Sequence, residues 1–187
     1  MTTNTLFCIA SGPSLTEEDC EAIRLTRIDT VAVNNSWERA RFCNFIYAGD
    51  SKWWSAYKNK ININAELWTS SRFISINHKI NYYHARGSFN SGMRAIQWGI
   101  WKGYKRIILL GYDCSIKNGI HWHKNHCDKN SSLGDPNDKK VAKWFPQFQT
   151  VADEAKEKNV EIINCSRYTE LICFKTMQLE EVIQLIK

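Results

Sequence analysis

A segment at residues 121–127 carries three histidines and a cysteine. Because an imidazole titrates near neutral pH, one of these histidines could act as a general base that takes a proton from a hydroxyl group. His121 and His123 would share a face of an extended segment, whereas His123 and His126 would share a face of a helix. Either pair could instead bind zinc together with Cys127 or the aspartate that follows it. The third interpretation is that these histidines lie on a surface loop and bind nothing.

Two short polar sequences follow apolar runs near the start of the chain. Ser11-Gly12-Pro13-Ser14 precedes a predicted helix, where a glycine allows close approach to a ligand and the helix amides attract phosphate. The same residues also make ordinary turns. The amide side chains of Asn34-Asn35 could bind a base or sugar through donors and acceptors together, or could cap a helix.

The elements that must position these residues follow from the spacing of apolar residues. Apolar runs too short for helices predict strands at 5–10, 29–33, 45–48, 106–110 and 160–164, with further extended segments at 66–70 and 73–76. Capping residues and helical spacing predict helices at 16–25, 51–59, 91–102, 139–158 and 179–186. The run at 106–110 is apolar on both faces, which is typical of the centre of a parallel sheet.

Alternation of strands and helices predicts an α/β fold: a single Rossmann-like three-layer domain over residues 1–187 with a mainly parallel sheet. In such sheets ligands bind at the carboxyl ends of the strands. Four loops should therefore converge on one site: Ser11-Gly12-Pro13-Ser14, Asn34-Asn35-Ser36, Gly49-Asp50-Ser51 and Gly111-Tyr112-Asp113.

Composition limits the class of protein. The chain has 187 residues, 43% of them hydrophobic, which suits a folded domain rather than a disordered one. Its net charge of +6 is uneven, because residues 51–150 carry 16 Lys and Arg against five acids (16 − 5 = +11). A basic middle predicts an anionic partner such as a nucleotide, a phosphorylated sugar or nucleic acid, or else solvated surface lysines.

Cellular location is also an expectation from sequence. The chain has no apolar run of about 18 residues and lacks a signal-peptide start, so we expect a soluble, cytoplasmic protein without a membrane partner. Its seven cysteines are an odd number, and most lie in or beside apolar runs. We therefore expect reduced thiols and no structural disulfide.

The order of the motifs carries a resemblance. The sequence Ile9-Ala10-Ser11-Gly12-Pro13-Ser14-Leu15 is followed by Val33-Asn34-Asn35, Ser91-Gly92, Gly103-Tyr104-Lys105-Arg106-Ile107, Gly111-Tyr112-Asp113, and a final strand before Cys165-Ser166 and Leu171. This ordered set resembles the bacterial sialyltransferases of glycosyltransferase family 42. It also resembles short phage proteins built on the same plan, for which the location would be the host cytoplasm. The Gly-Pro-Ser start is shared with the archaeal pterin diphosphokinase-like family.

The resemblance implies a glycosyltransferase that needs no metal and transfers a sugar from a CMP-sugar donor to a hydroxyl acceptor. It maps nucleotide contacts onto the Gly-Pro-Ser loop, the Asn after the second strand (Asn35) and the Ser-Gly helix start. Together with the strand-end loops, the expected nucleotide-binding residues are Ser11, Gly12, Pro13, Ser14, Asn34, Asn35, Asp50, Asn90, Ser91, Gly92 and Asp113.

The resemblance also places the catalytic histidine in the loop beyond the Gly-x-Asp strand, which makes His123 the first choice, followed by His126 and His121. The family's arginine three residues before the serine is Ser88 here, and Arg86 is a substitute candidate. The family's phosphate-stabilising tyrosines have no clear counterpart. The basic residues Lys117 and Lys124, or the imidazoles of the histidine segment, could supply that charge instead.

Other functions remain open at this point. One is diphosphate transfer from ATP, which would need Mg²⁺ on carboxylates such as Asp50 and Asp113. Another is a non-catalytic module that binds a nucleotide or zinc. The acceptor could be anionic, including nucleic acid such as modified DNA, and the chain could form an oligomer.

Overall fold

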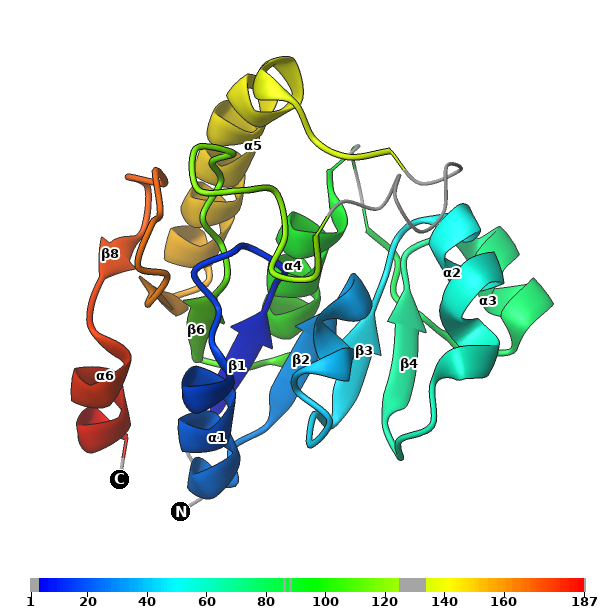
Figure 1. Ribbon diagram of the computed structural model, residues 1–187, viewed down its shortest axis with the longest axis horizontal. Coiled ribbons are helices and arrows are strands. Elements are labelled where there is room, and N and C mark those ends of the chain that lie inside the picture. The colour runs from blue at the N-terminus through cyan, green and yellow to red at the C-terminus, as the bar shows by residue number, and fades with distance from the viewer. Residues whose placement is uncertain (1–3, 86, 88, 125–133, 187) are drawn as a thin grey trace.

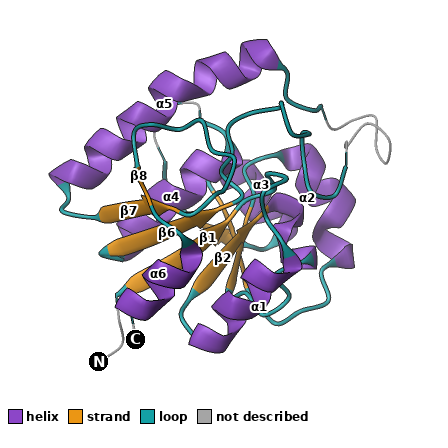
Figure 2. Cartoon of the chain, turned by 60° about the vertical axis from the view of Figure 1, so that its left-hand side comes forward, coloured by secondary structure: helices purple, strands orange, loops and turns teal. Residues whose placement is uncertain are grey.

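The computed structural model describes residues 4–85, 87, 89–124 and 134–186. Its strands form one eight-stranded sheet in the order β5-β4-β3-β2-β1-β6-β7-β8, and every neighbouring pair is parallel. Helices cover both faces, so the layers are helix, sheet and helix (Figures 1 and 2). The predicted α/β, Rossmann-like fold with a parallel sheet is confirmed.

The strands are β1 (Thr5–Ile9), β2 (Thr30–Val33), β3 (Phe45–Tyr47), β4 (Glu66–Thr69), β5 (Asn81–Tyr82), β6 (Arg106–Leu110), β7 (Glu161–Asn164) and β8 (Lys175–Thr176). The helices are α1 (Glu17–Thr26), α2 (Ser51–Tyr57), α3 (Arg72–His78), α4 (Ser91–Lys102), α5 (Asp138–Glu157) and α6 (Leu179–Leu185), with short 3₁₀ helices η1 (Asn34–Glu38) and η2 (Lys58–Lys60).

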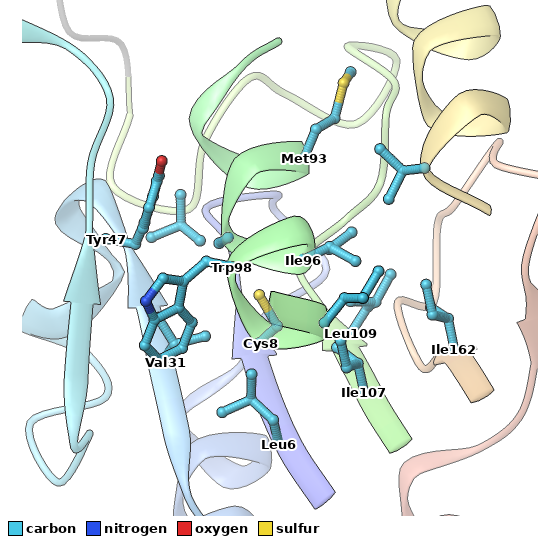
Figure 3. Close-up of a cluster of buried hydrophobic side chains, with 14 of the residues drawn as sticks. Leu6, Cys8, Val31, Tyr47, Met93, Ile96, Trp98, Ile107, Leu109 and Ile162 are labelled. Carbon is cyan, nitrogen blue, oxygen red and sulfur yellow. The ribbon is translucent and has the colours of Figure 1, made fainter. Parts of the chain in front are cut away.

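The sheet divides the core in two. On one face, side chains from β1 and β6 such as Leu6 and Leu109 pack against Ile96 and Trp98 of α4 (Figure 3). Helix α4 lies so close to the strands that a Cβ atom at Gly99 would come within 2.8 Å of Leu6 Cδ2. Side chains of α5 complete this face, and α1, α6, α2 and α3 cover the other.

Strand order fixes where the loops meet. From β1 the chain adds strands outward through β5, then returns through α4 to place β6 on the opposite side of β1. Phe7 of β1 therefore pairs with Ile108 of β6. Loops that leave two strands at such a switch point diverge, and this divergence opens a crevice at their carboxyl ends.

Most predicted elements are confirmed, with one error and two omissions. Residues 73–76 were expected to be extended but belong to α3, whose N-terminus is capped by Ser71 Oγ, which accepts from Ile74 N at 3.4 Å. The aromatic and β-branched side chains suit a strand, yet Phe73 and Ile76 are each 68% exposed, so burial does not dictate their conformation. The edge strands β5 and β8 have two residues each and carry no recognisable pattern.

The aromatic residues Trp53, Trp54 and Tyr57 of α2 lie in the core. The six described cysteines are all free thiols, whereas Cys127 lies outside the described residues. Among the helices described, none combines the length and apolar character needed to cross a membrane.

Candidate functional site

A cavity of about 240 Å³ lies at the carboxyl ends of β1, β2 and β6. The loops after these strands, the start of α4 and the beginning of α5 enclose it. Eight of the residues expected at the site line it: Ser11, Gly12, Asn34, Asn90, Ser91, Gly92, Asp113 and His121. The predicted convergence of strand-end loops is therefore seen, although the loop after β3 contributes no lining residue that the structure describes.

The floor of the cavity is made by two loops that pack backbone to backbone. Gly12 N donates a hydrogen bond of 2.8 Å to Gly111 O. A Cβ atom at Gly12 would lie 2.5 Å from that oxygen and 2.6 Å from Asp113 Cγ. Gly111 has φ +68°, and a Cβ there would collide with Ala10 O. Only glycine fits at either position.

Asp113 and Ser14 fasten these loops together. Ser14 N donates to Asp113 Oδ2 at 2.9 Å, and the Ser14 hydroxyl donates to the other carboxylate oxygen. Burial raises the pKa of Asp113, and the two hydrogen bonds from Ser14 oppose this increase. Asp113 lines the cavity, whereas Ser14 and Pro13 lie outside its described wall.

The N-terminus of α4 forms another wall. Asn90 Oδ1 accepts from Met93 N at 2.9 Å and caps the helix. Ser91 Oγ accepts from Gly49 N at 3.0 Å. The amides of Ser91 and Gly92 come too early in the helix to have an intrahelical acceptor, and such amides favour an anion.

The two asparagines after β2 have different surroundings. Asn35 is 3% exposed and does not line the cavity; its Nδ2 donates to Glu38 Oε1 at 2.8 Å, and its Oδ1 accepts from Trp53 Nε1 at 2.7 Å. Asn34 adopts φ +50° and does line the cavity. Its Oδ1 is buried and has no hydrogen-bond partner in the described parts of the chain. Of the two asparagines expected to contact a nucleotide, Asn34 therefore lines the cavity and Asn35 does not.

His121 and His123 also lie in different surroundings. His121 lines the cavity, and its Nδ1 lies 2.8 Å from Ser11 Oγ. On the other side of the ring, Nε2 lies 3.8 Å from Asp135 Oδ1. His123 is 7% exposed and does not line the cavity; its ring stacks on His121 with centroids 4.8 Å apart. The first choice, His123, is thus placed behind His121, and His126 lies outside the described residues.

Trp122 anchors the histidine segment to the rest of the molecule. Its backbone N donates to Ser11 O at 3.0 Å. The Arg39 guanidinium lies 4.1 Å from the centroid of the Trp122 ring, and the same group donates to Leu15 O at 2.5 Å. The loop after β6 is therefore held against the loop after β1, which fixes the position of His121.

Among the described residues, the lysine that lines the cavity is not one of the cations expected near a phosphate. Lys117 is exposed and paired with Glu170 at 2.6 Å, and neither it nor Lys124 lines the cavity. Arg86 lies outside the described residues. Lys140 of α5 does line the cavity, and its Nζ donates to Asp135 O at 3.1 Å. Its position in the first turn of a helix after a long loop is the one signal that could have found it.

The remaining wall is apolar, and the sequence analysis did not identify it. It comes from the loop after β6, the turn before α5 and α5 itself: Ile116, Ile120, Pro136, Trp144 and Phe148. Because these side chains come from separate segments, no local pattern shows that they meet. An aromatic and apolar wall suits the flat face of a base.

The carboxylates proposed to hold Mg²⁺ are not gathered at the cavity. Asp50 caps α2 by accepting from Lys52 N at 2.7 Å and does not line the wall. Within the described residues there is no group of three or more His, Cys, Asp or Glu side chains arranged to hold a metal ion. The zinc hypothesis depends on Cys127 or Asp128, which lie outside those residues.

No protein-family model and no curated protein matches the chain. One part of the cavity wall offers backbone amides, glycines and Lys140, another offers apolar side chains, and His121 lies among them. This arrangement can hold a phosphate beside a planar ring and place His121, as a general base, next to the phosphate.

Proposed function

We propose that the protein is a glycosyltransferase that moves a sugar from a nucleotide-sugar donor, with a CMP-sugar favoured, to a hydroxyl acceptor. The observation that carries this proposal is the cavity, where the start of α4, His121 and two glycine-bearing loops meet. These loops are the ones that carry Gly12 and Gly111. Its place at the switch point between β1 and β6 is where sheets of this topology bind nucleotides.

The donor would bind with its phosphate at the Ser91 and Gly92 amides, close to the glycine-bearing loops. The base or ribose would lie against the apolar wall that includes Trp144. Asn34 Oδ1, which lacks a partner among the described residues, would accept a hydrogen bond from an N–H or O–H of the nucleoside after a small side-chain rotation.

In the transfer step the acceptor oxygen attacks the anomeric carbon and loses its proton to His121. The bond between that carbon and the phosphate oxygen breaks, and its electron pair leaves with the phosphate. The Lys140 ammonium and the α4 amides favour this charged product electrostatically. Groups that act on charge developing in the transition state should affect kcat more than donor binding.

A monophosphate leaving group fits the charge of the wall. Lys140 is the one lysine or arginine among the lining residues that the structure describes. One cation and one helix N-terminus suit a CMP-sugar better than a diphosphate donor. Diphosphate transfer from ATP is less well supported, because Asp50 lies away from the cavity and both Asp113 oxygens accept bonds from Ser14.

Thermal unfolding with CMP, CDP, UDP, GDP, dTDP and ATP, each with Mg²⁺ or EDTA, tests the donor class. A ligand at 100 times its Kd adds about 2.7 kcal/mol to the free energy of unfolding. We expect stabilisation by CMP that is indifferent to EDTA. Stabilisation by ATP that requires Mg²⁺ would favour diphosphate transfer, and no response to any nucleotide would contradict the proposal.

Matched asparagine variants sharpen the test. Asn34→Gly keeps the positive φ and removes the amide, so the CMP-dependent rise in Tm should shrink. Asn35→Ala should lower Tm without ligand, because it removes bonds to Trp53 and Glu38, yet leave the rise with CMP intact. Release of CMP from CMP-N-acetylneuraminic acid then distinguishes a transferase from a module that only binds.

A further inference from the structure

Ser11, His121 and Asp135 lie in a row although they come from three separate segments of the chain. Ser11 Oγ is 2.8 Å from His121 Nδ1, and His121 Nε2 is 3.8 Å from Asp135 Oδ1. Ser11 and His121 line the cavity. The side chains of His121 and Asp135 are only 15% and 10% exposed, so water screens their interaction weakly.

The row favours one tautomer of His121. A carboxylate facing Nε2 favours a proton on that nitrogen, which leaves Nδ1 as an acceptor. Ser11 Oγ then donates to Nδ1. Both ring nitrogens face protein groups in this arrangement, so an acceptor hydroxyl would reach the imidazole through Ser11.

We propose that Ser11, His121 and Asp135 form a proton relay in which Ser11 Oγ, rather than a ring nitrogen, meets the acceptor hydroxyl. As the acceptor oxygen bonds to the anomeric carbon, its proton passes to Ser11 Oγ, and the Ser11 proton passes to His121 Nδ1. The bond to the phosphate breaks with its electron pair, so Ser11 ends neutral and His121 ends as an imidazolium. Asp135 is a positioning residue that stabilises this cation. The inference rests on the proposed function for the identity of the acceptor.

The surroundings hold the relay in place. The Ser11 carbonyl accepts from Trp122 N at 3.0 Å, which links the relay serine to the residue after His121. The ring of His123 stacks on His121 at 4.8 Å and fixes the plane of the imidazole. Lys140 Nζ donates to the Asp135 carbonyl at 3.1 Å, which ties Asp135 to α5.

Long-range ¹H–¹⁵N NMR of the histidine rings tests the relay without any ligand. Loss of a signal set in His121→Gln assigns His121. We expect the tautomer protonated on Nε2 in the unmodified protein, a shift of the Nδ1 resonance in Ser11→Ala, and a larger share of the other tautomer in Asp135→Asn. A wild-type His121 protonated on Nδ1 would overturn the relay, because Ser11 could then only accept from the ring.

Kinetics supply the second readout, with release of CMP from CMP-N-acetylneuraminic acid as the probe. Loss of a proton-transfer group costs about 10²–10⁴-fold in rate. Ser11→Ala should therefore lower kcat at least about 100-fold with little change in KM, and Ser11→Thr, which keeps a hydroxyl, should recover part of it. Asp135→Asn should also lower kcat. Ser55→Ala and Asp153→Asn, both on exposed helix surfaces, are the matched controls.

The outcomes separate the two proposals. Full activity in Ser11→Ala together with an inactive His121→Gln would mean that His121 meets the acceptor directly, which refutes the relay and leaves the proposed function standing. An unmodified protein that is stabilised by none of the six nucleotides and releases no CMP would refute the proposed function. The NMR result would then still decide whether Ser11 Oγ donates to His121 Nδ1.

Discussion

At the scale of single residues, neighbours of the same type have different roles. Asn34 faces the cavity whereas Asn35 bonds to Trp53, and His121 faces the cavity whereas His123 stacks behind it. Residue type alone therefore does not decide which of two nearby side chains meets a ligand.

Gly12→Ala tests the close packing of the two loops beneath the cavity. The added methyl group would meet Gly111 O and Asp113 Cγ at 2.5 and 2.6 Å, and neither atom is free to move. We expect a loss of about 1–3 kcal/mol in the free energy of unfolding, measured by urea denaturation. Gly49→Ala is the control, because its Cβ would make only an ordinary contact with Ser91 Oγ at 3.5 Å. Equal losses in both variants would argue against this packing.

Asp113→Asn tests the protonation of the buried carboxyl. Burial raises the pKa of Asp113 in the folded state, with the Ser14 hydrogen bonds opposing it, so the folded protein holds this proton to higher pH than the unfolded chain does. The free energy of unfolding should therefore fall as pH rises from about 4 through the raised pKa, by about 1.4 kcal/mol for each pH unit between the unfolded and folded pKa values. The variant should lack this part of the pH dependence. Parallel curves for both proteins from about pH 4 to about pH 8 would refute the assignment.

At the scale of elements, caps and one ion pair hold the loops around the cavity. Thr16 and Asp19 form a capping box at the start of α1. Arg167, which follows β7, donates two hydrogen bonds of 2.6 Å to the Asp19 carboxylate and one of 3.0 Å to Ser14 O. The loops after β1 and β7 are thereby joined next to the residue that holds Asp113.

Arg167→Ala should cost more stability than removal of a surface pair. Burial alone would raise the pKa of Asp19, but the bonds and charge of Arg167 and the Thr16 hydrogen bonds outweigh it and lower that pKa. Asp19 is 4% exposed and would keep a charge without its partner, so we expect a loss of about 1–3 kcal/mol at pH 7.

The effect of Arg167→Ala has a defined pH dependence. Because the pKa of Asp19 is lowered on folding, the pair contributes above the unfolded pKa and its contribution is lost as pH falls through the folded value. The difference between wild type and variant in chemical denaturation should therefore shrink below about pH 4. Arg24→Ala, which removes an exposed pair with Glu21, is the control and should change stability little. A gap that stays constant from about pH 7 to about pH 3 would show that the charge of Asp19 is not involved.

At the scale of the whole molecule, stability should grade from the centre of the sheet to its edges. Leu6 to Ile9 of β1 and Ile107 to Leu109 of β6 have no exposed surface, whereas β5 and β8 have two residues each with exposed side chains. The cavity opens from the most buried pair of strands, which gives its glycine-bearing loops a rigid base.

Native-state hydrogen exchange measures this gradient. Amides of β1 and β6 should exchange only through global unfolding and should follow the full dependence on denaturant. Amides of β8, such as that of Thr176, should exchange through local opening with little dependence on denaturant. Equal protection at β8 and β1 would contradict the gradient.

The α/β class, most strands and helices, and three of the four loops expected at the site could be predicted from the order of residues. These features are local or follow from general rules: apolar runs such as 106–110 form strands, Asn90 caps a helix, and parallel strands place their carboxyl ends on one edge. The same rules were wrong at 73–76, where Phe73 and Ile76 are exposed and the cap at Ser71 favours a helix.

Tertiary packing decides which of the two asparagines after β2, and which of His121 and His123, faces the cavity. Asn35 contacts Trp53 and His123 contacts Trp122. Asn34 and His121 line the cavity instead. Lys140, the apolar wall and the approach of Asp135 to His121 likewise depend on how α5 packs across the sheet. Such contacts join residues far apart in the chain, and they are fixed by packing rather than by any spacing that the sequence displays.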